Sequence, residues 1–581
     1  MILVALKAGL AGQESGAGRR RGSEALPEDI ESWLHVGEDG RITAFTGKVE
    51  MGQGIRTSLA QAIAEELRTP VGSVSLIMGD TDLTPFDMGT FGSRTTPTMA
   101  PQLHRAATAA REALIDLAAE RWKVDRATLT VSDGKVVNQR NKQSIDFGSL
   151  TKGRKLTKTI VASEPVTPAD KWVIAGTAVP KAAAREIVNG EHKYPSDINR
   201  PGMLYGKIVR PAAFEGTLAS ADTSAAESMS GVKVVRDGDF IGVTAPDEFL
   251  ASKAAAAIKT KWNAAPQPSD SELFHYLRKN TEKSSGGRGG YGGGGSHDVG
   301  SIDKGLADAD HKLEQTYTVA YIAHTPLEPR AAVAEWAEGK LTVWTGTQRP
   351  FGVKSELVQA FHLPENKVRV IMPDTGSAYG GKHTGECAIE AARLAKAAGK
   401  PVKLIWTREE EFTWAYFRPA GVIDVRSGAT KDGKITAWEF HNYNSGPSGI
   451  NTMYEVPNQR IEFHPTKAPL RQGSYRALAA TANHFARESH MDELATAVGV
   501  DPLEFRLRNL NDERLRAVFQ AAADRFGWGK RKPEAGRGFG MGGGFEKGGY
   551  VATCAEVAAD KSSGKVKLVK VVVAFDCGAV V

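Results

Sequence analysis

The sequence predicts an α+β fold of several domains, built around a module that occurs twice. Its 581 residues exceed the size at which a single hydrophobic core stops growing. Short β-branched runs alternate with helix-like segments along the chain. Two matched pairs of segments indicate the repeat: residues 39–47 (DGRITAFTG) match 338–346 (EGKLTVWTG), and 74–81 (VSLIMGDT) match 368–375 (VRVIMPDT), with a helix-like run between each pair.

Composition and cysteine spacing exclude several classes of protein. A net charge of +6, with Lys and Arg scattered along the chain, argues against nucleic acid as a partner. Cys387, Cys554 and Cys577 are too far apart for a disulfide framework or a CxxC metal site, and we expect all three to be small core residues. The apolar start, residues 1–12, is too short to cross a membrane and is interpreted as a signal-peptide remnant or a disordered terminus.

The first copy of the module begins with a predicted hairpin over residues 33–46, whose turn contains Gly40. MGQG (51–54) follows, and then a helix with Ile55, Leu59, Ile63 and Leu67 at four-residue spacing. Next come a strand over 74–78 and a long polar stretch rich in Gly, Thr and Pro. A second helix is predicted from about Arg105 to Arg121. Residues 171–265, with several short strand-like runs, are interpreted as a separate α+β domain.

The second copy leads from a strand over 368–372 into the glycine-rich turn 373–386 (PDTGSAYGGKHTGE) and a helix that ends at Gly399. A turn at the start of a helix presents unpaired backbone N–H groups, so an anion is expected there. Gly376, Gly381 and Lys382 nearly match a P-loop, but His383 stands where Ser or Thr would bind Mg²⁺.

Three further stretches carry candidate site residues. MGQG and the polar stretch around residues 90–96 combine glycines with hydroxyl and amide donors, which suits a phosphorylated ligand. We expect two packed copies of the module to bring this stretch and the second glycine-rich turn to one cleft. Prolines fix the turn that carries Glu328, which is either presented to a ligand or satisfied inside the fold. Arg476, in GSYR, could clamp an anionic or polarised oxygen.

Together, MGQG with its helix, GTFGSRTTP, HTPLEPR, YGGKH and SYRALAATANHFARESHMDELA resemble the large molybdopterin-binding subunit of xanthine oxidase-family hydroxylases, of the isoquinoline 1-oxidoreductase beta-subunit type. The resemblance covers about residues 30–581 and implies an a/b hammerhead domain inserted between repeated molybdopterin-binding modules. The implied division is 1–28 disordered or signal remnant, 29–165 N-terminal molybdopterin-binding module, 170–265 hammerhead domain, 283–298 glycine-rich linker, 299–530 molybdopterin-binding domain with the substrate pocket, and 531–581 the incomplete start of a final domain.

The resemblance also implies a molybdenum–molybdopterin cofactor, in the cytosine dinucleotide form, with no protein ligand to the metal. Tyr379 and Arg476 fall on active-site positions, and Ile322 stands where a glutamine near the molybdenum is expected. The implied cofactor-binding residues are Gly52, Gln53, Gly54, Gly92, Ser93, Arg94, Thr95, Thr96, Gly380, Gly381 and Lys382.

The implied reaction is hydroxylation of an N-heteroaromatic or aldehyde carbon with water. Because this chain cannot build an iron–sulfur cluster, its electrons are expected to pass to a [2Fe–2S] small subunit, with a cytochrome c as a candidate acceptor. The family's general-base glutamate is not matched, so we expect the isolated chain to hydroxylate weakly or not at all. The alternatives are a catalytically incomplete cofactor-binding fragment and a P-loop-like nucleotide-binding protein. The expected location is the periplasm if a twin-arginine signal lies upstream, and the cytoplasm for the chain as given.

Overall fold

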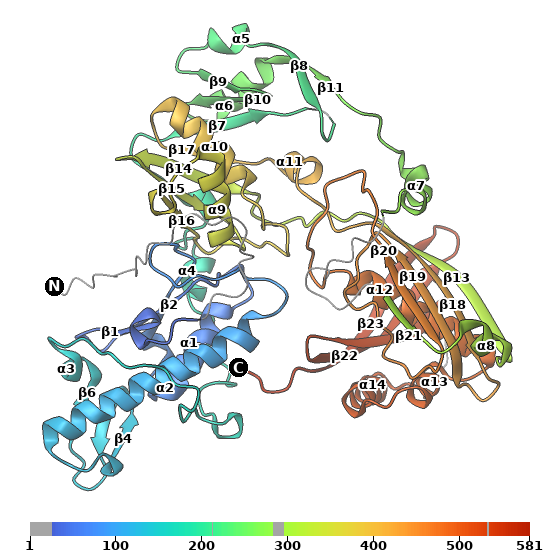
Figure 1. The fold of residues 1–581 in the computed structure, drawn as a ribbon, viewed down its shortest axis with the longest axis horizontal. Coiled ribbons are helices and arrows are strands. Elements are labelled where there is room, and N and C mark those ends of the chain that lie inside the picture. Colours follow the sequence, from blue (N-terminus) through green and yellow to red (C-terminus); the bar gives the residue numbers. More distant parts are fainter. Residues whose placement is uncertain (1–25, 212, 283–295, 531–533) are drawn as a thin grey trace.

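The computed structural model describes residues 26–211, 213–282, 296–530 and 534–581. Within these ranges the chain has a mixed α and β fold with several separate hydrophobic cores. Figure 1 shows the N-terminal elements (blue) next to the seven-stranded sheet (green to yellow), with most C-terminal elements (orange and red) in a body of their own. None of the helices in the described ranges combines the length and hydrophobicity needed to cross a membrane.

The first predicted module forms in the predicted order. Strands β1 (Leu34–Val36) and β2 (Ile42–Thr46) form an antiparallel hairpin. Helix α1 (Ile55–Leu67) then leads to β3 (Val74–Met78), which pairs parallel to β2. Alternate residues of β2 and β3 are buried, so one face of these strands packs on the core.

Helix α2 (Thr95–Trp122) begins at Thr95, whereas the sequence predicted a start near Arg105. Pro97 lies in the first turn, where its missing N–H has no partner anyway, and the helix continues through Pro101, which costs it one backbone hydrogen bond. The N-terminal part of the chain also contains β4 (Leu129–Ser132), β5 (Lys135–Asn138), β6 (Ser144–Asp146) and α3 (Phe147–Thr151).

The second copy repeats this topology within a larger sheet. Strands β14 (Ala331–Ala337) and β15 (Lys340–Thr345) form an antiparallel hairpin, and β16 (Val368–Ile371) returns parallel to β15 after helix α9 (Pro350–Phe361). Helix α10 (Glu386–Ala398) covers this part of the sheet and ends at Gly399, as predicted. The internal repeat is therefore present as two β-β-α-β units.

The middle segment has a small core of its own and shares a sheet with the second copy. Its strand β7 (Leu204–Val209) pairs parallel to β17 (Val402–Ile405), which pairs with β14. The resulting sheet has seven strands in the order β16-β15-β14-β17-β7-β10-β9. The other elements of the segment are β9 (Lys233–Asp237), β10 (Phe240–Ala245), α6 (Glu248–Ala257) and a separate ribbon of β8 (Thr217–Asp222) with β11 (Lys259–Asn263).

The C-terminal body combines a five-stranded and a three-stranded sheet with several helices, of which the short α8 (Ile302–Ala307) packs on the larger sheet. The larger sheet has the order β12 (Ser296–Val299), β20 (Gln459–His464), β19 (Ile435–Tyr443), β18 (Gly421–Ala429) and β13 (His311–Val319). The other elements are α12 (Ala480–Val498), α13 (Pro502–Arg508), α14 (Glu513–Phe526), β21 (Arg537–Glu546), β22 (Gly549–Asp560) and β23 (Lys565–Asp576).

The structure differs from one prediction in this body. Met541 and Cys554, from β21 and β22, share one core with Phe519 of α14, so residues of the predicted final domain pack against the domain before it. Cys554 and Cys387 are buried as expected, but Cys577 is exposed, so the prediction of a core role for it is wrong. Most of the predicted terminus 1–28, and residues 283–295 of the predicted linker, lie outside the described residues.

Substitutions at two glycines of β21 can test how closely this strand packs on α14. A Cβ added to Gly543 would lie 2.5 Å from Cζ of Phe519 and 2.8 Å from the carbonyl oxygen of Val551, whereas one added to Gly538 would meet nothing within 4 Å. Overpacking of this kind typically costs about 1–3 kcal/mol. We expect Gly543→Ala to lower the midpoint of thermal unfolding by several degrees and Gly538→Ala to leave it near that of the wild type. Equal midpoints for the two variants would contradict this packing.

Candidate functional site

A cavity of about 1610 Å³ lies where the two copies of the module meet. The copies are joined through their matched segments, because the N–H of Thr81 donates to the carbonyl of Val370 (3.0 Å) and the N–H of Met372 donates to that of Gly79 (3.2 Å). The loops that follow β3 and β16 therefore leave the junction side by side. Residues of both loops line the cavity, which confirms the predicted common cleft.

Most of the predicted site residues lie in the wall of this cavity. Gln348 and Arg349, which were not predicted, also line it. Three predicted cofactor-binding residues are absent from the wall: Gly54, Gly381 and Lys382. Those that line it are Gly52, Gln53, Gly92, Ser93, Arg94, Thr95, Thr96, Tyr379, Gly380 and Arg476.

The glycines of the second turn allow close packing. A Cβ on Gly381 would lie 2.7 Å from Cγ of His324, and one on Gly380, whose φ is +95°, would lie 2.9 Å from the carbonyl oxygen of Ser474. The N–H of Gly380 donates to Oε1 of Gln348 (2.9 Å), and that of Gly381 donates to the carbonyl of Ala378 (2.8 Å). Both N–H groups are thus satisfied within the protein, while Gly380 still lies in the cavity wall.

The start of α10 is likewise occupied by the protein's own carboxylates. The N–H of Gly385 donates to Oε2 of Glu356 (2.7 Å), and Glu386 in the first helical turn forms an ion pair with Arg471. Burial raises the pKa of Glu356 above its ordinary value. The expected anion at this helix start is thus a protein side chain, which uses the same favourable end of the helix dipole.

Lys382 points into the fold. Its side chain is 1% exposed, and its Nζ donates to Oγ1 of Thr375 (3.0 Å) and lies 3.8 Å from Oε2 of Glu328. Burial lowers the pKa of Lys382 to about 8. A P-loop lysine must reach a phosphate, so the P-loop-like interpretation of this turn is wrong.

Glu328 is a structural carboxylate, which decides between the two roles that the sequence left open. It accepts hydrogen bonds from the N–H and the hydroxyl of Ser196 (3.0 and 2.9 Å), from the hydroxyl of Thr375 (2.6 Å) and from the N–H of Gly376 (2.7 Å). It thereby ties the middle segment to the second glycine-rich turn.

Gln348 links the two loops across the cavity wall. Its Nε2 donates to the carbonyl of Thr90 (2.9 Å), while its Oε1 accepts from Gly380. The resemblance placed a missing glutamine at Ile322, but Ile322 lies outside the wall and is 38% exposed. The sequence did contain a signal for Gln348, since GTQ directly follows the second copy of the repeated hairpin.

Two arginines lie in the cavity wall, which also contains acidic residues such as Glu50, Glu356 and Glu546. Cζ of Arg476 lies 4.3 Å from the ring centroid of Tyr379, and Nη1 of Arg349 donates to the carbonyl of His383 (3.4 Å). In the described part of the chain, neither guanidinium forms an ion pair with a carboxylate, whereas the nearby Arg56 is paired with Asp374. Guanidinium groups without carboxylate partners favour an anionic or strongly polar ligand.

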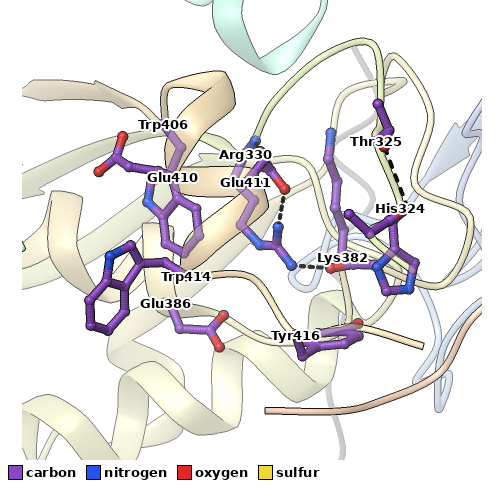
Figure 2. A network of polar contacts seen from close by, with 12 residues as sticks. His324, Thr325, Arg330, Lys382, Glu386, Trp406, Glu410, Glu411, Trp414 and Tyr416 are labelled. Atoms are coloured by element: carbon purple, nitrogen blue, oxygen red, sulfur yellow. Dashed lines mark hydrogen bonds and ion pairs between the residues drawn. The ribbon is translucent and has the colours of Figure 1, made fainter. Parts of the chain in front are cut away.

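A buried polar network supports the second turn from behind. Arg330 is 3% exposed, forms an ion pair with Glu411 and donates to the carbonyl of Gly381 (Figure 2). Its guanidinium also lies 5.1 Å from the ring of Trp406 and 5.7 Å from that of Tyr416. The hydroxyl of Tyr416 in turn donates to the carbonyl of Gly380, so both glycines are anchored by side chains below the cavity.

Comparison with known families matches most of the described chain. Residues 8–184 and residues 291–510 each match a family described as "Molybdopterin cofactor-binding domain". The two matched regions contain the two copies of the β-β-α-β unit, and loops of both line the cavity.

Two curated relatives match along nearly the whole sequence. A nicotinate dehydrogenase chain from Pseudomonas putida is 29% identical over 95% of this chain, and the beta chain of isoquinoline 1-oxidoreductase from Brevundimonas diminuta is 26% identical over 94%. The chain spans 50% of the length of the first relative and 79% of the second.

Solved structures share the fold at lower identity. CO dehydrogenase from Oligotropha carboxidovorans aligns with a TM-score of 0.54 and 21% identity, covering 67% of this chain and 59% of that one. Quinoline 2-oxidoreductase from Pseudomonas putida aligns with a TM-score of 0.53 and 20% identity, covering 65% and 57%. The chain therefore has the mixed, multidomain α/β fold of these proteins.

The buried Lys382 gives the stability of the site region a defined pH dependence. Between pH 8 and 10.5 the unfolded chain keeps a proton on this lysine that the folded chain loses, so folding becomes more favourable as the pH rises through this window. The full shift corresponds to about 3 kcal/mol. Thermal unfolding should show the wild type gaining stability relative to Lys382→Met between pH 8 and 10.5. The exposed Lys152→Met is the control, and a difference that is flat across this window would contradict the assignment.

Proposed function

This chain belongs to the molybdopterin-binding subunits of the xanthine oxidase family, and we propose that the cavity between its two repeats holds the molybdenum cofactor in its cytosine dinucleotide form. The observation that carries the proposal is the guanidinium of Arg349 in the cavity wall, which forms no ion pair with a carboxylate within the described ranges. A dinucleotide cofactor brings phosphates that such groups bind.

The residues of the wall fit this group in size and chemistry. Cavities for drug-sized ligands measure about 300–1,000 Å³, so a volume of about 1610 Å³ suits a dinucleotide better than a small molecule. The segment Gly92–Thr96 offers hydroxyl and backbone donors to the pterin, and Gln53, whose Nε2 donates to the carbonyl of Val49, has a second amide N–H for it. Arg349 lies on the same wall and would hold a phosphate. The metal would take no ligand from these side chains.

We assign Tyr379 and Arg476 to the substrate side of the cavity. When bound, the molybdenum cofactor supplies the transfer of oxygen from water to carbon and takes up two electrons. The protein's part is to orient the substrate, and a guanidinium packed on an aromatic ring can hydrogen-bond a polar oxygen while the ring meets a flat substrate. The names of these two relatives support an N-heteroaromatic substrate, and a further relative named aldehyde oxidoreductase supports an aldehyde as the alternative.

We propose that the electrons leave through an iron–sulfur partner. The described cysteines are single free thiols in three separate places, so this chain offers no cluster ligand set. We propose a [2Fe–2S] small subunit as the partner, with a cytochrome c as a candidate acceptor beyond it. We also propose that residues 170–265 form the hammerhead domain of the family, which their small core around Ile241 and Ala251 supports.

Gln348 provides the test of cofactor binding. The full chain, produced in a host that makes the cofactor, should contain about one molybdenum and one releasable pterin. Gln348→Leu leaves the carbonyl of Thr90 and the N–H of Gly380 unpaired, at about 1–3 kcal/mol for each buried group. We expect it to reduce molybdenum content by tenfold or more. Gln520→Leu, on the surface of α14, should have no effect, and normal loading of Gln348→Leu would contradict the site.

Arg476 provides the test of substrate binding. The loaded chain together with its iron–sulfur partner is assayed by dye reduction with nicotinate, isoquinoline and benzaldehyde. Arg476→Met should retain molybdenum but raise KM about tenfold for the anionic nicotinate, which corresponds to about 1.4 kcal/mol, and less for the neutral compounds. Arg126→Met, on the surface, is the control. An equal loss for all three substrates would argue against this role, and full molybdenum loading without any turnover would support the alternative of a cofactor-binding chain that is catalytically incomplete.

A further inference from the structure

A cluster of metal-ligating side chains lies on the five-stranded sheet of the C-terminal body. His441 is on β19, and Glu462 and His464 are on β20, which runs parallel to β19 (Figure 1). His441 pairs with Glu462 across the two strands, and His464 is two residues beyond Glu462. Since side chains alternate between the faces of a strand, all three project from one face of the sheet. None of them lines the cavity described above.

The donor atoms of these three residues form a nearly regular triangle. Nδ1 of His441 lies 3.1 Å from Nε2 of His464. Oε2 of Glu462 lies 3.5 Å from the first of these nitrogens and 3.6 Å from the second. A tetrahedral zinc site has metal–ligand bonds of about 2.0–2.1 Å, so its ligand atoms are about 3.3–3.4 Å apart. The three measured separations lie on either side of this value, so little movement is needed to bind an ion.

The surroundings hold the first histidine in the form that binds a metal. Nε2 of His441 lies 3.3 Å from Oε1 of Glu439, and this carboxylate is itself fixed by an ion pair with Arg426 (2.7 Å). A carboxylate that accepts the N–H of one ring nitrogen leaves the lone pair of the other nitrogen free for a metal. The ring of His464 is stacked on Tyr443, with 4.5 Å between the centroids, which fixes its orientation.

We propose that His441, Glu462 and His464 bind a divalent transition-metal ion of the Zn²⁺ class, apart from the cofactor cavity. Two imidazoles and one carboxylate suit Zn²⁺, whereas Mg²⁺ and Ca²⁺ prefer oxygen ligands throughout. The side chains of the three ligands are between 23% and 39% exposed, so the ion has access from solvent and water can fill the fourth position. The ion would join β19 to β20 through their side chains.

The test is metal binding by the full chain without an affinity tag, because a histidine tag would itself bind Zn²⁺. Isothermal titration with Zn²⁺ should give about one site per chain, and Mg²⁺ at the same concentrations should give none. His441→Ala, Glu462→Gln and His464→Ala should each weaken binding at least tenfold. His35→Ala, which removes an exposed histidine of β1, should bind as the wild type does. X-ray absorption at the zinc edge should report two imidazole ligands.

Thermal unfolding keeps the proposal falsifiable if a variant folds poorly. Zn²⁺ should raise the unfolding midpoint of the wild type and of His35→Ala, and it should not raise that of His464→Ala. Binding should be the same with and without the molybdenum cofactor, which separates this site from the cavity. Absence of a stoichiometric site in the wild type, or a site that survives all three substitutions, would overturn the proposal.

Discussion

The second glycine-rich turn depends on one buried cation, Arg330. Its guanidinium is paired with Glu411, donates to the carbonyl of Gly381 and lies against the rings of Trp406 and Tyr416. Removing one partner of a buried pair typically costs about 3–5 kcal/mol because the other charge stays buried and unpaired. This arrangement therefore fixes the backbone between Tyr379 and Gly381, and the cavity wall is built on that backbone.

The same arrangement explains why a loop rich in glycine is not a phosphate loop here. Glycine allows close approach, but the sequence does not say what approaches. In this protein His324 and the backbone of Ser474 occupy the space beside Gly381 and Gly380, and internal carbonyl and amide oxygens accept their N–H groups. Phosphate binding and tight internal packing both require glycine at positions of close approach. Only contacts between residues far apart in the sequence distinguish the two cases.

The local sequence pattern predicted the helices and strands themselves better than it predicted which strands pair with one another. The hairpin β1–β2, helix α1 and strand β3 follow from hydrophobic spacing and turn residues, and the matched segments predicted the second unit. The pairing of β7 with β17 joins residues almost 200 positions apart, and no local signal specifies it. In the site, Gln53, Tyr379 and Arg476 were found through motifs. Gln348 was missed because its role depends on two loops that meet only in the folded chain.

The junction between the repeats determines where the cavity lies and what it can bind. Asp80 and Ile371 form a β-bridge between the two copies, and the ion pair of Arg369 with Asp80 (2.6 Å) reinforces it. Charges at the junction itself are thus neutralised within the protein. Beyond it the loops diverge, and Arg349 and Arg476 remain without carboxylates in the described part of the chain. A duplicated unit that joins at its matched strands leaves a cavity between its loops, so the pairing at the junction determines where the cavity lies.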